Sequence, residues 1–206
     1  MKLINTFLFL LLTSVAVFGQ GSVADTSSVS KKIHESAERE PTFPGGGANF
    51  FAFIHRSLHY PEVANLVGIK GKVSISFTVG KDGYLKNIHA LDTIGARCEE
   101  EAVRVVTSSP RWTPGLQNGI PIDVKYTIGI AFSAPKSIIN LKELRTSNYA
   151  FIFEIKGIIY TIDDTENILG KSFPANWVES ALPCANKQQY SFSNKKDIYL
   201  IKIKTL

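Results

Sequence analysis

Apolar and polar residues alternate in two long stretches of the chain, and this alternation is the pattern of a β-strand with one buried face. In residues 72–79 the apolar positions are Val73, Ile75, Phe77 and Val79. In residues 122–132 they are Ile122, Val124, Tyr126, Ile128, Ile130 and Phe132, which predicts the longest strand of the protein. Lys81-Asp82-Gly83 has the composition of a hairpin turn, so a weaker strand over 84–91 is expected to pair antiparallel with the first.

A helical spacing of apolar residues occurs at two other places. Phe50, Phe53 and Ile54 recur at i, i+3 and i+4 after the turn Pro44-Gly45-Gly46-Gly47, which predicts a helix. Pro61 ends this helix and begins a short second one, and Gly68 stands where a C-terminal glycine cap belongs. The three glutamates at 99–101 favour the first turn of a third helix, whose apolar stripe is Ala102, Val105 and Val106.

The C-terminal third of the chain predicts a second group of strands. Residues 135–148 are expected to be a connector. The β-prone run over 149–162 is interrupted by Gly157 and predicts a strand pair, while 173–182 is expected to hold a short helix around Trp177. Alternation predicts a final strand over 197–204, so we expect residues 149–206 to form a small β-rich annex.

The N-terminus has the pattern of a secretory signal. Lys2 precedes an apolar run over 3–18, and Val17 and Gly19 are the small residues of a cleavage site, which predicts a signal peptide over 1–19. The alternative is an uncleaved inner-membrane anchor over 3–19. Residues 20–40 are polar and are expected to form a tether. We therefore expect an exported protein of the periplasm or cell envelope.

Composition and charge exclude several classes of function. The 206 residues are 44% hydrophobic and 20% charged, as in ordinary globular proteins. The formal charge of +5 is spread along the chain without a basic cluster interleaved with aromatics, so nucleic acid is not an expected partner. Because the sequence contains no nucleophile motif and no phosphate-binding glycine loop, we expect neither catalytic residues nor a cofactor.

Two histidines and two cysteines have side chains that could bind a metal or form a disulfide. His55 and His59 are spaced i, i+4 and could share a helix face, but no third ligand accompanies them, so they predict surface histidines and no metal site. Cys98 and Cys184 are an even pair in an exported chain and could form a disulfide. The alternative is that Cys98 is a small buried residue at the start of a helix. The sequence alone leaves both readings open.

Several separated motifs together resemble one known family. They are Phe43-Pro44-Gly45-Gly46, Tyr60-Pro61 with Ala64, Gly68-Ile69-Lys70-Gly71-Lys72-Val73, Lys81-Asp82-Gly83, Glu100-Glu101-Ala102, Pro110-Arg111-Trp112-Thr113-Pro114-Gly115 and Asn118-Gly119. In this order they resemble the C-terminal domain of TonB-type energy transducers, in the form found in Bacteroidetes. The resemblance implies a domain over 41–134 with a compact α+β fold, in which two helices pack on one face of a three-stranded antiparallel sheet.

The resemblance also implies a function and a site. Domains of this family bind the TonB box, a short peptide of outer-membrane transporters, by adding it as a strand to an open sheet edge, in TonB-dependent transmembrane transport. Carried over to this sequence, the edge is Asp123, Val124, Lys125, Tyr126, Thr127, Ile128, Gly129 and Ile130, with His59, Tyr60 and Pro61 nearby. The expected partner is an outer-membrane TonB-dependent transporter or another envelope protein, and a homodimer is also compatible with such an edge.

Two alternative functions follow from the parts of the chain outside this domain. In the first, the protein is a structural or assembly protein of the envelope whose annex pairs with the same edge and covers it. In the second, residues 3–19 stay in the inner membrane and the protein is an energy transducer. In both alternatives, as in the leading interpretation, the protein is not an enzyme.

Overall fold

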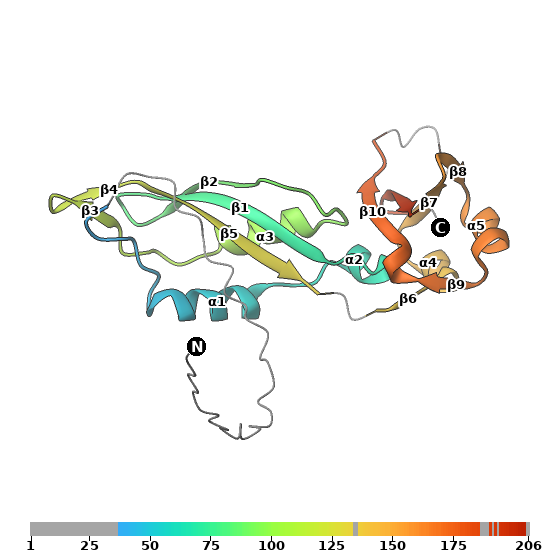
Figure 1. Cartoon of the computed structure of the whole chain (residues 1–206), viewed down its shortest axis with the longest axis horizontal. Coiled ribbons are helices and arrows are strands. Elements are labelled where there is room, and N and C mark those ends of the chain that lie inside the picture. Colours follow the sequence, from blue (N-terminus) through green and yellow to red (C-terminus); the bar gives the residue numbers. More distant parts are fainter. Residues whose placement is uncertain (1–36, 134–135, 186–189, 191, 193, 205–206) are drawn as a thin grey trace, which may run out of the picture.

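The computed structural model describes residues 37–133, 136–185, 190, 192 and 194–204. The predicted signal peptide over 1–19, and the tether except for its last four residues, 37–40, lie outside the described residues. The described part is elongated, with one group of elements at each end (Figure 1).

A three-stranded antiparallel sheet forms the first half of the molecule. Its strands are β1 (Gly71–Val79), β2 (Leu85–Ala90) and β5 (Val124–Phe132), in the order β2-β1-β5. The two alternating stretches of the sequence therefore become strands as predicted, and their apolar positions on β1 are fully buried. The prediction that 122–132 is the longest strand is wrong. The strand β5 begins only after Asp123 and is nine residues long, which is also the length of β1.

Three helices accompany this sheet. They are α1 (Gly46–Ser57), α2 (Glu62–Val67) and α3 (Cys98–Thr107). Helix α3 packs on β1 and β2, and α1 contacts α3. The apolar residues Phe50 and Ile54 of α1 are buried, as the i, i+4 spacing predicts. Gly68 ends α2 with a φ of 65°, a left-handed conformation that glycine adopts without steric strain. The α+β fold inferred from the resemblance is confirmed.

A short hairpin extends one end of the sheet. Its strands are β3 (Gly115–Gln117) and β4 (Ile120–Ile122), joined by Asn118 and Gly119, both with positive φ. The chain before α1 runs beside it, because Arg39 pairs with Leu116 and Thr42 with Thr113. The segment preceding the first helix is thereby held against the segment that leads into β5.

The second half of the molecule, residues 136–204, is named the C-terminal unit here. Its elements are β6 (Ile138–Asn140), α4 (Leu141–Thr146), β7 (Ala150–Ile155), β8 (Ile158–Tyr160), α5 (Ile162–Leu169), β9 (Ser172–Pro174), η1 (Ala175–Trp177), β10 (Val178–Pro183) and β11 (Ile198–Ile203). The main sheet has the order β10-β11-β7-β8, and β7 runs parallel to β11. The strand pair interrupted by Gly157, the short helix at Trp177 and the last strand agree with the sequence predictions.

The expected connector over 135–148 differs from the structure. Residues 138–146 form β6 and α4, and Ile139, Leu141 and Leu144 are buried in the core. Asn140 caps α4 by accepting a hydrogen bond from the Lys142 N–H at 2.9 Å. Most of the predicted connector is therefore part of the C-terminal unit.

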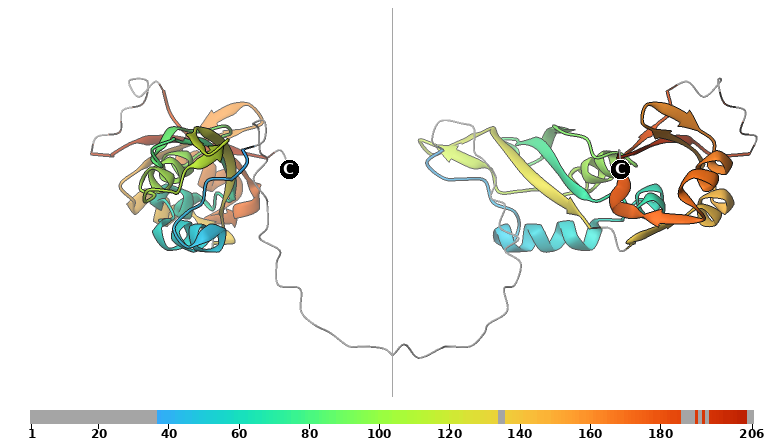
Figure 2. Two further views of the ribbon diagram at one scale, coloured as in Figure 1. Left: turned by 90° about the vertical axis from the view of Figure 1, so that its left-hand side faces the viewer. Right: turned by 45° about the vertical axis from the view of Figure 1, so that its right-hand side comes forward.

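The two halves meet through small residues packed closely together. The Ala96 N–H donates to the Ala181 carbonyl oxygen at 2.7 Å, and a methyl group on Gly95 would lie 2.4 Å from that same oxygen. A methyl group on Gly68 would lie 2.6 Å from Ala175 Cβ. One continuous hydrophobic core includes buried residues of both halves. Figure 2 shows the C-terminal unit against the end of the first sheet where β1 begins and β5 ends.

Candidate functional site

The outer edge of β5 is the predicted peptide-binding edge, and within the described ranges β5 pairs on one side only. Its pairing with β1 is an uninterrupted antiparallel register, from Val124 opposite Val79 to Phe132 opposite Gly71. Figure 1 shows β5 at the margin of the sheet, with α1 next to it. A strand in this position presents backbone N–H and C=O groups that another strand can pair with.

The register indicates which residues of β5 direct their backbone groups outward. The Ser74 N–H donates to Asp92 Oδ1 at 2.7 Å and the Ser74 carbonyl accepts from the Leu91 N–H at 2.8 Å, so the Ser74 backbone faces β2. Gly129 lies opposite Ser74, and its backbone therefore points away from β1. Because this direction alternates along a strand, the outward-facing residues of β5 are Lys125, Thr127, Gly129 and Ala131.

Asp123, the first residue of the predicted edge, is not part of β5. It lies between β4 and β5, and its Oδ1 accepts a hydrogen bond from the Lys81 N–H at 2.8 Å. Its Oδ2 lies 2.6 Å from Lys86 Nζ, and this lysine, with the Lys81 N–H, holds the pKa of the Asp123 carboxyl below its usual value. Including Asp123 in the edge strand was wrong, because its carboxylate binds the β1–β2 turn.

The two faces of β5 differ in the side chains that they carry. The buried residues Val124, Ile128, Ile130 and Phe132, with half-buried Tyr126, lie on the face that packs against the helices. On the other face, a methyl group at Gly129 would lie 1.6 Å from Lys72 Cε, so the lysine side chain covers this glycine. One face of the edge is therefore aromatic and aliphatic, and the other is polar.

His59, Tyr60 and Pro61 lie at the end of β5 rather than along it. The Tyr60 hydroxyl donates to the Ile69 carbonyl, and its ring meets the Phe132 ring edge-on with 6.1 Å between centroids. Burial raises the pKa of Tyr60 to about 12. Pro61 precedes α2 as its N-cap residue, and His59 is exposed beside α3. Tyr60 supports the last residue of β5 from the buried side of the sheet.

A cluster of aromatic rings lies under the first half of β5. Trp112 contacts Phe50, Phe43 and Phe77 with centroid separations of 5.0, 5.7 and 5.9 Å, and Tyr126 of β5 stacks on Phe77 at 5.9 Å. The Tyr126 hydroxyl donates to Glu40 Oε2 at 2.8 Å. Burial, together with this carboxylate, raises the pKa of Tyr126. A cavity of about 300 Å³ opens between this cluster, α1 and β5.

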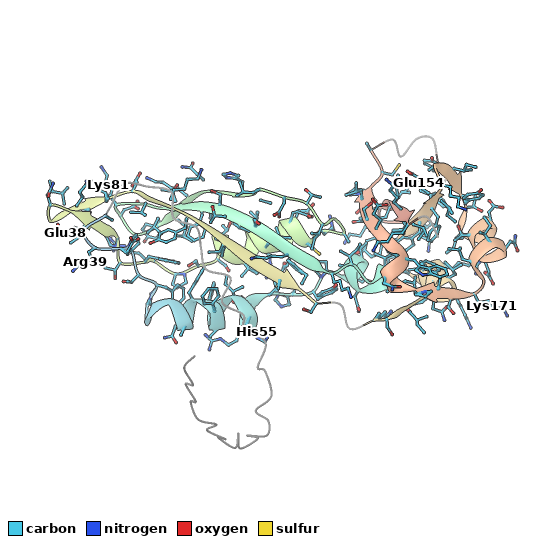
Figure 3. All side chains as sticks on the ribbon, viewed as in Figure 1. Glu38, Arg39, His55, Lys81, Glu154 and Lys171 are labelled. Atoms are coloured by element: carbon cyan, nitrogen blue, oxygen red, sulfur yellow. The ribbon has the colours of Figure 1, made fainter. Side chains whose placement is uncertain are left out.

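The C-terminal unit does not cover the β5 edge in the part that the structure describes. Its strands pair with one another, and its contacts with the first half include those of Gly68, Gly95 and Ala96. The alternative in which the annex pairs with the edge is therefore wrong for these residues. Figure 3 shows Glu154 and Lys171 of the C-terminal unit at the opposite end of the molecule from Glu38 and Lys81.

Comparison with known proteins gives one consistent family. The family model of the Gram-negative bacterial TonB protein C-terminal matches residues 56–134. This segment contains β1, β2, β5 and the edge described above. Residues 56–134 belong to the TonB C-terminal domain family.

Two individual proteins resemble this TonB C-terminal domain. Protein TonB of Pseudomonas aeruginosa is 32% identical over 60 residues, which are 29% of this chain and 18% of that protein. The solution structure of the Helicobacter pylori TonB C-terminal domain is 24% identical and covers 45% of this chain and 88% of that one, with a TM-score of 0.34. The chain thus spans less than a fifth of the length of the Pseudomonas relative.

The matched TonB segment is flanked on both sides by elements that the family model does not cover. Most of α1 and the preceding residues 41–45 lie before the matched segment, and the C-terminal unit lies after it. One wall of the aromatic cavity therefore comes from outside the matched segment, while β5, Phe77 and Trp112 come from inside it. The sequence contained a signal for this cavity in Phe43, Phe50 and Phe51, but Phe50 was interpreted only as part of a helix stripe and Phe43 only as part of a family motif.

The two cysteines lie in different halves of the molecule, Cys98 in this TonB domain and Cys184 in the C-terminal unit. No disulfide joins Cys98 to Cys184: Cys98 is buried at the start of α3, and Cys184 follows β10. Burial and the neighbouring Glu99 and Glu100 raise the pKa of the Cys98 thiol to about 12. The sequence allowed a disulfide as one of two readings, and the buried-residue alternative is confirmed.

His55 and His59 do not share a helix face. Helix α1 ends at Ser57, and Leu58 is already extended, so only His55 lies on the helix, on its exposed side (Figure 3). Across the described ranges, no three His, Cys, Asp or Glu side chains gather in a way that could hold a metal ion. Within the same ranges, no helix has the length and apolarity needed to span a membrane.

Glu101 joins α3 to the end of α1 in this domain. Its Oε1 accepts from the His59 N–H at 2.6 Å, and both of its oxygens accept from Arg104 at 2.7 Å. Arg104 in turn donates to the Ser57 carbonyl at 2.7 Å. Burial alone would raise the pKa of Glu101, but the hydrogen bonds from Arg104 and His59 lower it below the ordinary value.

The Glu101→Gln variant is expected to lose about 1 to 2 kcal/mol of unfolding free energy at pH 7. Because the pKa of Glu101 is lowered in the folded state, this stabilisation is full above the unfolded carboxyl pKa and is lost as pH falls through the folded value. Urea titrations at pH 7 and pH 3 measure it. Glu100→Gln, on the same helix and exposed, is the control. An equal loss for both variants at pH 7 would contradict the assignment.

Proposed function

We propose that the protein binds an extended peptide segment of an outer-membrane TonB-dependent transporter by adding it as a further strand beside β5. In this role the protein takes part in TonB-dependent transport in the cell envelope. The observation that carries the proposal is the free edge of β5 within a segment that belongs to the TonB C-terminal domain family. The backbone groups of Lys125, Thr127, Gly129 and Ala131 supply the hydrogen bonds.

The edge has the features that strand addition requires. Its outward-facing backbone groups alternate with residues that hold β5 to β1, so a new strand can pair without disturbing the existing ladder. Gly129 and Ala131 carry no side chain larger than a methyl group, and Lys125 is exposed. The basic Lys72 and Lys125 on the polar face favour a partner segment with acidic residues on that face.

The sharpest test removes one outward-facing backbone donor. The Thr127→Pro variant loses the N–H that points away from β1, and proline is tolerated at such an edge position because the lost donor faces solvent. We expect this variant to lose at least tenfold in affinity for a synthetic TonB-box peptide, measured by calorimetric titration of the full chain. Thermal unfolding should show that the variant is still folded.

Thr127→Ala is the matched control for this experiment. It removes the side chain but keeps the backbone N–H, so it should bind the peptide as the wild-type chain does. If Thr127→Pro also binds like the wild type, the peptide is not added at this edge. Sedimentation of the protein without peptide measures its oligomeric state. A dimer that Thr127→Pro disrupts would mean that the edge pairs with a second copy of the chain.

A further inference from the structure

The cavity of about 300 Å³ is lined in part by β5, the strand with the free edge. Tyr126 and Ile128, two residues of the edge strand itself, form one of its walls. Pro41 to Phe43 and the first turns of α1 form the other wall. A strand that pairs with β5 therefore lies along the mouth of this cavity.

The lining of the cavity is suited to an apolar side chain. It consists of Pro41, Thr42, Phe43, Gly47, Phe50, Phe51, Phe77, Trp112, Tyr126 and Ile128. Phe77 and Trp112 are buried at its base, with 0% and 7% of their surface exposed, whereas Phe51 at the rim is 53% exposed. The Tyr126 hydroxyl already donates to Glu40. Aromatic walls with a buried base favour an apolar occupant over a charged one.

The register of β5 determines which side chains of an added strand would face the cavity. Tyr126 and Ile128 carry their side chains on the helix side, and their backbone groups face β1. Residues of an added strand that lie opposite them also carry their side chains on the helix side. The residues between, which bond to Thr127 and its outward-facing neighbours, carry theirs on the polar side.

We propose that this cavity is the specificity pocket of the edge and holds one large apolar side chain, aliphatic or aromatic, of the bound peptide. The inference rests on the proposed strand addition, and it specifies which peptide sequences the edge would bind. The recognised segment has a large apolar residue flanked on both sides by polar or small residues, so that alternate side chains meet the pocket and the polar face. The wall supplied by residues 41–51 precedes the segment that the family model matches.

A host–guest peptide series tests the pocket. The probes are acetyl-Thr-Thr-Glu-X-Glu-Thr-Thr-amide, with alanine, leucine or phenylalanine at X, titrated calorimetrically into the full chain, so that X meets the pocket and the two glutamates beside it meet the polar face. Burial of the larger side chain should tighten binding by roughly ten- to a hundredfold relative to alanine. The same affinity for all three peptides would overturn the pocket, while binding itself would leave strand addition standing.

Two variants in the first turn of α1 separate the pocket from the edge. A Cβ at Gly47 meets nothing within 4 Å, so Gly47→Leu fits the helix and occupies the mouth. This variant should keep the affinity for the alanine peptide and lose the preference for leucine and phenylalanine. Ala48→Leu, at the neighbouring exposed position that does not line the cavity, should keep the preference. An unchanged preference in Gly47→Leu would contradict the pocket.

The same experiment distinguishes failure of the pocket from failure of the proposed function. Thr127→Pro should weaken all three peptides together, because it acts on the backbone and not on the cavity. If none of the peptides binds the wild-type chain, strand addition is wrong and the pocket inference falls with it. If the chain alone forms a dimer that Gly47→Leu dissociates, the occupant is a second copy of the chain and the peptide proposal is wrong.

Discussion

The Trp112→Ala variant is expected to lower the free energy of unfolding by about 3 to 5 kcal/mol, the range for removing a large side chain from a packed core. Trp112 is 7% exposed and contacts the rings of Phe43, Phe50, Phe77 and Tyr126. Its Nε1–H donates to Ser109 Oγ at 2.8 Å, and that acceptor also loses its partner in the variant. Guanidinium titration followed by circular dichroism measures the loss.

Trp177→Ala is the control for this substitution. Trp177 is half-buried in the C-terminal unit and stacks on Phe173 with 6.4 Å between ring centroids. Because it has fewer ring contacts and more solvent exposure than Trp112, its removal should cost less. A loss at Trp112 no larger than the loss at Trp177 would show that the aromatic cluster does not organise the first half of the molecule. In Trp112→Ala the base of the proposed pocket is also missing, so the preference for large apolar side chains should disappear.

The second large effect is expected at the junction between the two halves. Gly95 has a φ of 84°, and a methyl group there would lie 2.4 Å from the Ala181 carbonyl oxygen. Gly95→Ala should therefore destabilise the protein by about 2 to 4 kcal/mol, from backbone strain and from weakening of the Ala96–Ala181 hydrogen bond. Hydrogen exchange of the Ala96 amide reports the local part of this loss.

Gly157→Ala separates the strain from the contact. Gly157 has a similar φ of 79°, and a Cβ there would meet nothing within 4 Å. This control should show only the strain of the left-handed conformation, about 1 to 3 kcal/mol. The difference between the two variants then measures the junction. If both variants lose the same free energy and Ala96 exchanges equally in both, the C-terminal unit is not held by this contact.

Alternation of side chains predicted β1 and β5 because the apolar positions of each of these strands lie on a buried face. In β1 and in β5 the buried apolar residues are the ones at the alternating apolar positions of the sequence. The break at Asp123 was not predictable, because alternation continues through Ile122 and Val124. At this break the Asp123 carboxylate accepts a hydrogen bond from the Lys81 N–H, a contact with a residue distant in sequence that no local pattern shows.

The features that could not be predicted from the sequence depend on contacts with residues elsewhere in the chain. Helix α4 has only six residues, too short for its period to stand out, although Asn140 is a usual cap residue and Leu141 and Leu144 are buried at i, i+3. The parallel pairing of β7 with β11 joins segments about fifty residues apart, and such pairings leave no local pattern. The cavity has the same origin, because its walls come from residues 41–51 and from β5.

The nine register pairs between β1 and β5 also determine how the sheet responds to a mechanical load. Alternate pairs of this ladder are hydrogen-bonded, and a force directed along β5 acts on all of those hydrogen bonds at once, in shear, so that no single pair has to carry it. The pairing of β1 with β2 is irregular between Ser76 and Thr78, so a load passed on to β2 meets an interruption there. The strand whose free edge is proposed to bind a partner is thus also the strand paired without interruption to its neighbour in the sheet, so we expect it to resist a pull from a bound partner.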